Sequence, residues 1–371
     1  MSLRERLAKN QGSEFTDRLF KRFGVLQNPF PAANQTSGHP HWPMPQDSEA
    51  EDRIVTFLGD GKSQVVVVEG TQGVGKTNFL NHFEVEIRSV LNEGSVFSED
   101  RYYMVRYLAD PEPSFDGMTR RLFEELGVDH LKKLSEELAR EQAPINEARS
   151  RDMQKALQRL AENSSQGNLS AMMDWLLGLR LLKSHRAAIG VQFRLDTVES
   201  KVSALRDLVQ VSGSAGILDG IFLLLDELEK QGGVLTPRPL VRYLSAIRSI
   251  VDALPNRLFL MMGVTPDALR RYQEMLPALR GRLQNQITLS PLEGEDDALK
   301  LKDFYVDTAR KAAQHERSRE GGQEEVVDMI KVRKLFAALL EQAGRQGDKG
   351  VRQREFLHKL HLLAEDTIRD S

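Results

Sequence analysis

The residues best suited to chemistry lie in one short segment with the sequence Gly-Thr-Gln-Gly-Val-Gly-Lys-Thr, at positions 70–77. Glycines in this G-x-x-x-x-G-K-T pattern allow backbone N–H groups to turn around phosphate oxygens. Lys76 supplies a positive charge for the β- and γ-phosphates, and the Thr77 hydroxyl is a ligand for Mg²⁺. The segment therefore predicts binding of a nucleoside triphosphate with Mg²⁺. The expected nucleotide contacts are Gly70, Thr71, Gln72, Gly73, Val74, Gly75, Lys76, Thr77 and the following Asn78.

A second group with chemical potential follows the apolar run 221–225, where Asp226 and Glu227 stand side by side. A carboxylate at the end of a buried strand, beside a phosphate-binding loop, can hold the Mg²⁺ shell, which suits Asp226. Glu227 can orient and polarise a water for attack on the γ-phosphate. An apolar strand that merely ends in acidic surface residues is the alternative. The intact loop upstream favours the functional interpretation.

The elements that must position these residues alternate between strands and helices. The β-branched run 65–68 precedes the loop, and a helix is expected over 78–90. The other apolar runs predict strands at 102–108, 221–225, 258–262 and 286–289. Such alternation indicates an α/β fold of the P-loop type, with a five-stranded parallel sheet flanked by helices.

Helical periodicity accounts for most of the remaining chain. We expect helices over 46–58 and 239–254, a long helical stretch over 118–211, and helices from 296 to the end with a break at 317–323. The sequence thus divides into a mostly irregular N-terminal segment, an ATPase core that carries the helical stretch as an insertion, and a C-terminal helical lid. Their predicted bounds are 1–50, 51–294 with the insertion at 118–211, and 295–371.

Composition narrows the classes of function. The net charge of −3 gives no general attraction for nucleic acid, so contact with DNA would need a local basic patch or a partner. The absence of cysteine excludes disulfides and thiolate chemistry. No apolar run approaches the length of a membrane span, and the charged first residues do not resemble a signal peptide. We therefore expect a cytoplasmic protein without a membrane partner.

The order of these motifs resembles that of AAA+ ATPases. The loop of that family is typically G-x-x-G-x-G-K-T, which Gly73 and the other loop residues match. In the family, a polar residue called sensor 1 follows the next strand and touches the γ-phosphate or the attacking water. The strand at 258–262 is followed by Gly-Val-Thr-Pro, so the resemblance implies Thr265 for this role. A Thr-Pro helix start is the alternative, because threonine is a good N-cap.

The resemblance also implies two arginines. AAA+ proteins carry an arginine before the fifth strand that reaches the γ-phosphate of the neighbouring subunit, which matches Arg282, with Arg280 in reserve. The segment 350–357 is similar to the sensor 2 helix, whose arginine folds back onto the nucleotide of the same subunit. Arg354 fits its context, and Arg352 is the alternative. A homo-oligomer, as a ring or filament with an arginine acting in trans, is therefore implied.

Within AAA+, the chain is similar to the ExeA-like and origin-recognition-like branch and to ATP-binding proteins of bacterial phage-defence clusters of BREX type. The Asn-Pro-Phe entry at Asn28 and Phe30 carries part of this resemblance, and it implies that these residues lie against the adenine. One departure is the separation of 150 residues between Lys76 and Asp226, which makes the helical stretch an insertion or an elongated helical region.

Two weaker signals are expected to be structural. The histidine pairs, which are His39 with His41 and His358 with His361, lack the further ligands of a metal site. A basic cluster in the insertion accompanies two aromatic residues and is formed by Arg180, Lys183, His185, Arg186 and Arg194 with Trp175 and Phe193. It is either a solvated helix face, which we favour, or a contact for DNA or an acidic partner.

Two functions remain open on this evidence. The first is an enzyme that hydrolyses ATP to assemble or remodel a DNA-associated complex of several proteins, as in anti-phage defence. The second is an ATP-dependent adaptor or scaffold, in which nucleotide binding rather than turnover controls the recruitment of partner proteins. The adjacent Asp226 and Glu227 favour the enzyme.

Overall fold

The structure is a computed structural model that describes residues 13–32, 35, 38–93, 99–108, 115–226 and 237–369. The chain forms two compact units. The loop unit, which contains the phosphate-binding loop, comprises residues 1–44, 70–81 and 289–371. The sheet unit comprises residues 45–69 and 82–288.

The sheet unit is built on five strands, all parallel, in the order β2-β3-β4-β1-β5. Their bounds are β1 (Gln64–Glu69), β2 (Tyr102–Leu108), β3 (Gly220–Asp226), β4 (Leu258–Val264) and β5 (Asn285–Thr288). The predicted α/β fold with a five-stranded parallel sheet is therefore confirmed. Since every strand runs the same way, the residues that follow β1, β3 and β4 all leave the sheet at the same edge.

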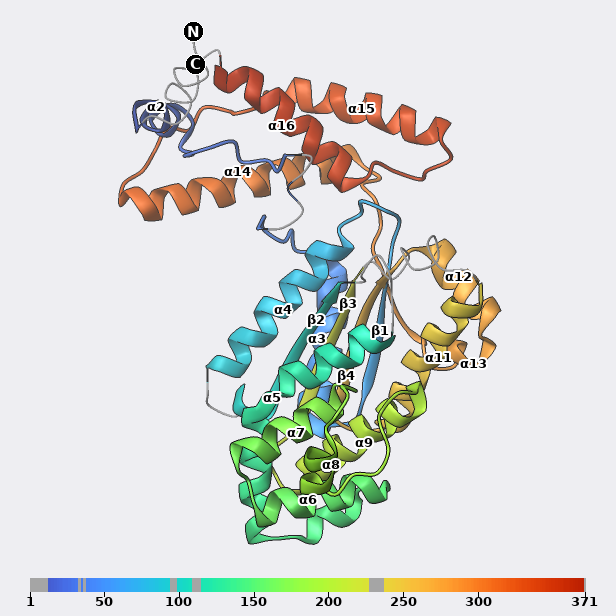
Figure 1. The fold of residues 1–371 in the computed structure, drawn as a ribbon. Helices are drawn as coiled ribbons and strands as arrows, with labels where there is room; N and C mark the ends of the chain where they lie inside the picture. The colour runs from blue at the N-terminus through green and yellow to red at the C-terminus, as the bar shows by residue number, and fades with distance from the viewer. Residues whose placement is uncertain are drawn as a thin grey trace. The chain divides into compact units, whose positions relative to one another are not determined.

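Helices cover both faces of this sheet (Figure 1). The helices of the sheet unit are α3 (Pro45–Asp60), α5 (Phe115–Arg140), α6 (Arg151–Glu162), α7 (Gln166–Leu176), α8 (Lys183–Ile189), α9 (Val198–Ser214), α11 (Pro237–Ala253), α12 (Pro266–Met275) and α13 (Pro277–Arg280), with short 3₁₀ turns η1 (Glu99–Arg101) and η2 (Ala143–Glu147). The helix that follows the phosphate-binding loop, α4 (Lys76–Asn92), is shared by the two units.

Burial on both faces explains why the central strands are apolar throughout. Every residue of β3 and β4 is buried, as expected for strands inside a parallel sheet. Alternate residues such as Leu223 and Leu260 share one core with α5, α9 and α11. On the opposite face the Phe57 ring of α3 lies 5.1 Å from that of Phe222 and 5.6 Å from that of Phe259. The sheet is thus fixed by packing from two sides.

The segment predicted as a helical insertion contains α6, α7 and α8, which follow α5 and precede α9 in the chain (Figure 1). Side-chain caps define where its helices begin. Ser150 caps α6, Ser165 caps α7, and Thr197 caps α9 in a reciprocal capping box with Ser200. Left-handed Gly190 ends α8. The helical character expected for 118–211 is confirmed, and η2, caps and turns divide it.

The loop unit has its own core. Its helices are α2 (Ser13–Phe23), α14 (Glu295–Arg317), α15 (Met329–Arg345) and α16 (Gln353–Arg369). Phe23, Phe30, Tyr305 and Phe356 are among the buried residues of this core. Helix α2 lies in the segment expected to be mostly irregular, and it forms because its apolar residues pack into this core with the C-terminal helices.

Among the described residues, none of the helices combines the length and the apolar character that a span of the bilayer requires.

Candidate nucleotide-binding site

The phosphate-binding loop connects the end of β1 to the start of α4, as its sequence predicted. Gly73 and Gly75 have φ angles of +84° and +110°, which side chains other than hydrogen strongly disfavour. Lys76 is 7% exposed, and its Nζ donates to the carbonyl oxygens of Gly70 at 2.9 Å and Thr71 at 3.3 Å. The loop thus folds around its own lysine, which supplies a buried positive charge at the beginning of α4.

The first residues of α16 lie directly on this loop. The Arg354 backbone N–H donates to the Gly73 carbonyl oxygen at 3.0 Å. A Cβ atom on Gly73 would lie 3.5 Å from the Arg354 Cβ, and one on Gly75 would lie 3.1 Å from the Gln353 Oε1. The predicted sensor 2 segment is therefore beside the loop. The Arg354 side chain is exposed, whereas the Arg352 guanidinium donates to Asp348 at 2.8 Å.

Asn78, in the first turn of α4, anchors a histidine-containing segment to the loop. Its Oδ1 accepts a hydrogen bond from the His41 Nδ1 at 2.8 Å, and its Nδ2 donates to the carbonyl oxygens of His39 and Pro40 at 3.3 and 3.4 Å. The Tyr305 hydroxyl lies 3.1 Å from the His39 Nδ1. Burial lowers the pKa of His39, against the hydrogen bond with Pro40, and Arg354 lowers it further. These contacts hold His39 and His41 in place; nothing in the sequence pointed to Tyr305.

The Asn-Pro-Phe segment is tied to α16. The Asn28 Nδ2 donates to the His361 carbonyl oxygen at 3.0 Å, while the Asn28 Oδ1 accepts the Phe30 N–H at 3.1 Å. The His361 Nδ1 in turn donates to the Phe30 carbonyl oxygen at 2.7 Å. The Phe30 ring is 2% exposed and lies in the core of the loop unit. In this conformation Phe30 acts as a core residue that fixes the segment, so its adenine contact stays a prediction.

In the sheet unit, Asp226 is the last residue of β3 and is held by an arginine from the neighbouring strand. The Arg106 guanidinium on β2 donates to the Asp226 Oδ2 at 2.8 Å, and the two side chains are 15% and 1% exposed. A buried carboxylate needs such a partner because desolvation disfavours its charge. Sequence reasoning missed Arg106, since its link to Asp226 depends on the pairing of β2 with β3. Glu227 lies outside the described residues.

Thr265 directly follows β4, as predicted for the sensor 1 position, and it also caps α12. Its Oγ1 accepts the Ala268 N–H at 3.4 Å, and Pro266 is the first helical residue. This is the N-cap role that the sequence left open as the alternative. Because β4 pairs with β3 in parallel, Thr265 lies at the same edge of the sheet as Asp226.

Arg282 precedes β5 and forms an ion pair within the chain. Its Nε donates to the Asp252 Oδ1 at 2.8 Å, and the Arg248 Nε donates to the other oxygen at 3.2 Å. Burial opposes ionisation of Asp252, but the hydrogen bonds from Arg282 and Arg248 hold its pKa below the ordinary value. Arg280, the reserve candidate, is exposed at the end of α13. Both arginines are thus at the protein surface, where a neighbouring molecule can be reached.

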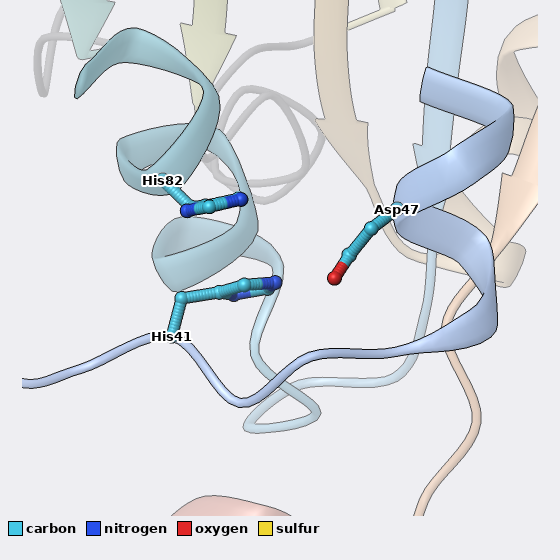
Figure 2. A group of neighbouring side chains, drawn as sticks. All are labelled: His41, Asp47 and His82. Atoms are coloured by element: carbon cyan, nitrogen blue, oxygen red, sulfur yellow. The ribbon is translucent and has the colours of Figure 1, made fainter. Parts of the chain in front are cut away.

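Asp47 and His82 are two neighbouring polar residues of the sheet unit outside these motifs (Figure 2). Asp47 lies in the first turn of α3 and His82 lies on α4, with their ligand atoms within 4.8 Å of each other. Figure 2 also labels His41, a residue of the loop unit. The two ligands of the sheet unit do not by themselves make a structural metal site, and we assign no ion to Asp47 and His82.

Comparison with solved structures gives distant similarities. The chain is similar to the Aeropyrum pernix ORC2 protein in its ADPNP-ADP complexes, with 12% identity, a TM-score of 0.43, and coverage of 91% of this chain and 72% of that one. It is also similar to the Walker-type ATPase PABY2304 of Pyrococcus abyssi, with 12% identity, a TM-score of 0.35, and coverage of 88% and 73%. A third similarity is to Cdc6p from Pyrobaculum aerophilum, with 12% identity, a TM-score of 0.36, and coverage of 86% of this chain and 67% of that one. At these scores no structural role is transferred from them.

The search of curated proteins gives no match. A family model described as "BREX system ATP-binding protein BrxC/D" matches residues 119–364, which is more than half of the chain. This match begins in α5 and reaches α16, so it includes Asp226, Thr265, Arg282 and Arg354 and starts after the phosphate-binding loop. The loop that is predicted to bind phosphate and the family described as ATP-binding indicate the same kind of ligand. The chain belongs to the family of BREX system ATP-binding proteins BrxC/D.

Proposed function

We propose that this protein hydrolyses ATP with Mg²⁺ and uses the cycle to assemble or remodel a DNA-associated complex of several proteins in anti-phage defence. The observation that carries the proposal is the loop at 70–77, with left-handed glycines, a buried lysine and the start of α16 against it. Its chemistry is specific for phosphate. Membership in the BREX ATP-binding family supports the cellular role.

The reaction is transfer of the γ-phosphoryl group to water. A water oxygen forms a bond to the γ-phosphorus as the bond between that phosphorus and the β,γ-bridging oxygen breaks, and the water proton passes to Glu227 or solvent. We assign the phosphate charge to Lys76, the polarisation of water to Glu227, and the sensing of the γ-phosphate to Thr265. In this proposal the Thr265 hydroxyl gives up its hydrogen bond with the Ala268 N–H and contacts the γ-phosphate instead.

Mg²⁺ fits the donor chemistry of two further residues. A hydroxyl and a carboxylate are hard oxygen ligands of the kind that this ion prefers, and Thr77 and Asp226 supply them. When bound, the ion neutralises charge that develops on the β- and γ-phosphates. The Asp226 carboxylate lies at the end of a buried strand, where the Arg106 guanidinium forms an ion pair with it.

Two arginines are proposed to contact the nucleotide, one from a neighbouring subunit and one from the same subunit. Arg282, with Arg280 as the reserve, would reach the nucleotide of a neighbouring subunit, while Arg354, with Arg352 as the reserve, would connect the nucleotide to α16. The permanent charge and planar fork of arginine suit both tasks. Two observations support these assignments: Arg282 is exposed, and the Arg354 backbone N–H donates a hydrogen bond to the Gly73 carbonyl oxygen.

The test is the ATPase rate per subunit as a function of protein concentration. We expect the rate to rise steeply as subunits associate, Glu227→Gln to bind ATP but lose turnover, and Arg282→Ala to lose about a thousandfold in rate. Arg270→Ala is the matched control, because Arg270 is also an exposed arginine with an aspartate partner, Asp267. A rate that is independent of concentration, together with full activity of Arg282→Ala, would contradict the action in trans.

One observation favours the adaptor as a second candidate. The carboxylate of Asp226 is engaged by Arg106, so metal binding must compete with an ion pair that is already formed. Such competition would slow turnover without preventing the binding of ATP. If Glu227→Gln retains defence and partner recruitment at wild-type levels, binding alone is sufficient and the adaptor is correct.

A further inference from the structure

The connection between α7 and α9 exposes three large apolar side chains. Leu179, Leu182 and Phe193 are 41%, 64% and 74% exposed, and all three lie between residues 178 and 194, around the short helix α8. Three large exposed apolar side chains on one short segment are uncommon at a protein surface that contacts only water. We call residues 178–194 the α8 surface.

The exposed position of Phe193 is enforced by a buried framework. The buried Asp152 Oδ2 accepts the N–H groups of Gln192 and Phe193 at 2.9 and 2.8 Å. The Trp175 Nε1, also from a buried side chain, donates to the Phe193 carbonyl oxygen at 2.9 Å. Three hydrogen bonds therefore fix the backbone on both sides of the ring. A ring held outward by buried polar groups is preorganised for contact.

The same segment is strongly basic. It contains Arg180, Lys183, Arg186 and Arg194 and neither Asp nor Glu, although the whole chain has a net charge of −3. Arg194 also closes the segment on itself, because its guanidinium donates to the Gly178 carbonyl oxygen at 3.2 Å. Positive charge and apolar area thus share one short, ordered stretch.

A cavity adjoins Phe193 and continues the basic character. Its volume is about 440 Å³, and its lining includes Phe193 and Arg194 together with Arg151, Lys155 and the hydrogen-bonded Asp152 of α6. Two serine hydroxyls, those of Ser200 and Ser203 on α9, also line it. The volume lies within the range of natural ligand pockets and is large enough for one apolar side chain and a neighbouring carboxylate.

We propose that the α8 surface binds an acidic segment of a partner protein whose apolar side chains contact Leu179, Leu182 and Phe193 while its carboxylates face the surrounding arginines and lysines. An apolar centre with a charged rim is the ordinary anatomy of such an interface. The leucines favour a protein over a nucleic acid, because bases stack on aromatic faces and gain little from an aliphatic side chain. This surface does not depend on the nucleotide site.

The test uses a labelled synthetic peptide of about 16 residues, in which leucine and phenylalanine recur every three or four positions between glutamates. Binding to the full chain is followed by fluorescence anisotropy. We expect saturable binding that weakens at high salt, because the rim charges are screened. Leu182→Ser combined with Phe193→Ala, and separately Arg194→Glu, should each weaken binding about tenfold or more, whereas Lys76→Ala should leave it unchanged.

Matched control variants separate the surface from general effects. Val55→Ser removes an apolar side chain that is 68% exposed on α3, and Arg120→Glu reverses an exposed charge on α5. Both should bind the peptide as the wild type does. Unchanged melting temperatures of all variants would show that the losses do not reflect unfolding.

Three outcomes would overturn the proposal. The first is peptide binding that is absent, or equal in the wild type and the α8-surface variants. The second is a labelled oligo-dT strand that binds instead and is lost in the same variants, which would assign the surface to single-stranded nucleic acid. The third is self-association in sedimentation experiments that the same variants abolish without any peptide binding, which would assign the surface to a second copy of the chain.

Discussion

Lys76 in the loop unit and Asp226 in the sheet unit are both buried charges that the nucleotide site is expected to use, but they are neutralised in different ways. Lys76 donates to carbonyl oxygens of Gly70 and Thr71, within its own loop. Asp226 depends on Arg106, which is 120 residues away in the sequence and reaches it only because β2 pairs with β3. The first arrangement is local and the second is tertiary. They should therefore respond differently to substitution.

The local charge should show its effect in the affinity for ATP. Lys76→Ala removes the cation intended for the phosphates together with its hydrogen bonds to the carbonyl oxygens of Gly70 and Thr71. We expect ATP affinity to fall about a hundredfold, which corresponds to about 3 kcal/mol. Titration with a fluorescent ATP analogue measures the affinity. Lys62→Ala, at an exposed lysine beside Asp60, is the control and should bind normally.

The tertiary charge should show its effect in stability. Arg106→Met leaves the Asp226 carboxylate in a buried place without the guanidinium, so the free energy of unfolding should fall by about 3 kcal/mol. Arg101→Met is a matched control, because Arg101 and Asp219 form a 2.8 Å pair near the other end of the same two strands, with side chains 44% and 35% exposed. That substitution should cost below about 1 kcal/mol. Equal losses in urea unfolding would contradict the role of burial.

A third buried group, the His130 imidazole, should make the free energy of unfolding depend on pH. His130 on α5 lies 2.9 Å from the Tyr103 hydroxyl and 2.8 Å from the Ser212 hydroxyl, and burial, with a smaller contribution from Lys133, lowers its pKa from 6.5 to about 4. Between these values the unfolded chain binds a proton that the folded chain does not. The free energy of unfolding should therefore decrease as pH falls from 6.5 toward 4, and this contribution is fully present only above 6.5.

Urea unfolding at pH 7.5 and pH 5 measures this dependence. We expect His130 to account for about 2 kcal/mol of the difference between the two conditions, so His130→Gln should show a smaller difference than the wild type. His185→Gln, at an exposed histidine on α8, should retain the wild-type difference. An unchanged pH dependence in His130→Gln would show that other groups account for the loss.

The smallest effect is expected where no charge or ring is buried. Leu182→Ala on the α8 surface should change the free energy of unfolding by less than about 0.5 kcal/mol, because this side chain is 64% exposed. Leu176→Ala, only six residues earlier but 1% exposed, should cost about 3 kcal/mol. Thermal unfolding of the two variants gives the contrast. A large loss for Leu182→Ala would mean that the α8 surface contributes to folding.

Much of the fold was predictable because its signals are local. The strands at 65–68, 102–108, 221–225 and 258–262 agree with β1 to β4 within about two residues, since continuous apolar runs bounded by turns leave few alternatives. The last strand begins one residue earlier than expected, at Asn285. Helix α2 was not predicted, because its short amphipathic pattern is stabilised by contacts with α14 and other distant residues rather than by its own propensity.

For the candidate site, residue type and spacing predicted where the residues stand in the fold. The loop at 70–77 lies between β1 and α4, and Asp226 is the last residue of β3. Arg106 and Tyr305 could not have been found in this way, because each acts through a partner that chain folding brings to it. The nucleotide roles of all these site residues remain predictions, including those of the loop, Asp226 and Glu227 and the adenine contact of Phe30.

The sequence by itself determined the chemistry of the phosphate-binding loop, since backbone N–H groups, flexible glycines and Lys76 are encoded within eight consecutive residues. It also determined a parallel sheet with helices on both faces. Only the tertiary structure decided that Arg106 neutralises Asp226 and that the Phe193 ring is held exposed. It also decided that the first turn of α16 contacts the loop at Gly73. The reason is physical: hydrogen bonds and ion pairs between distant residues depend on packing, which no short stretch of sequence specifies.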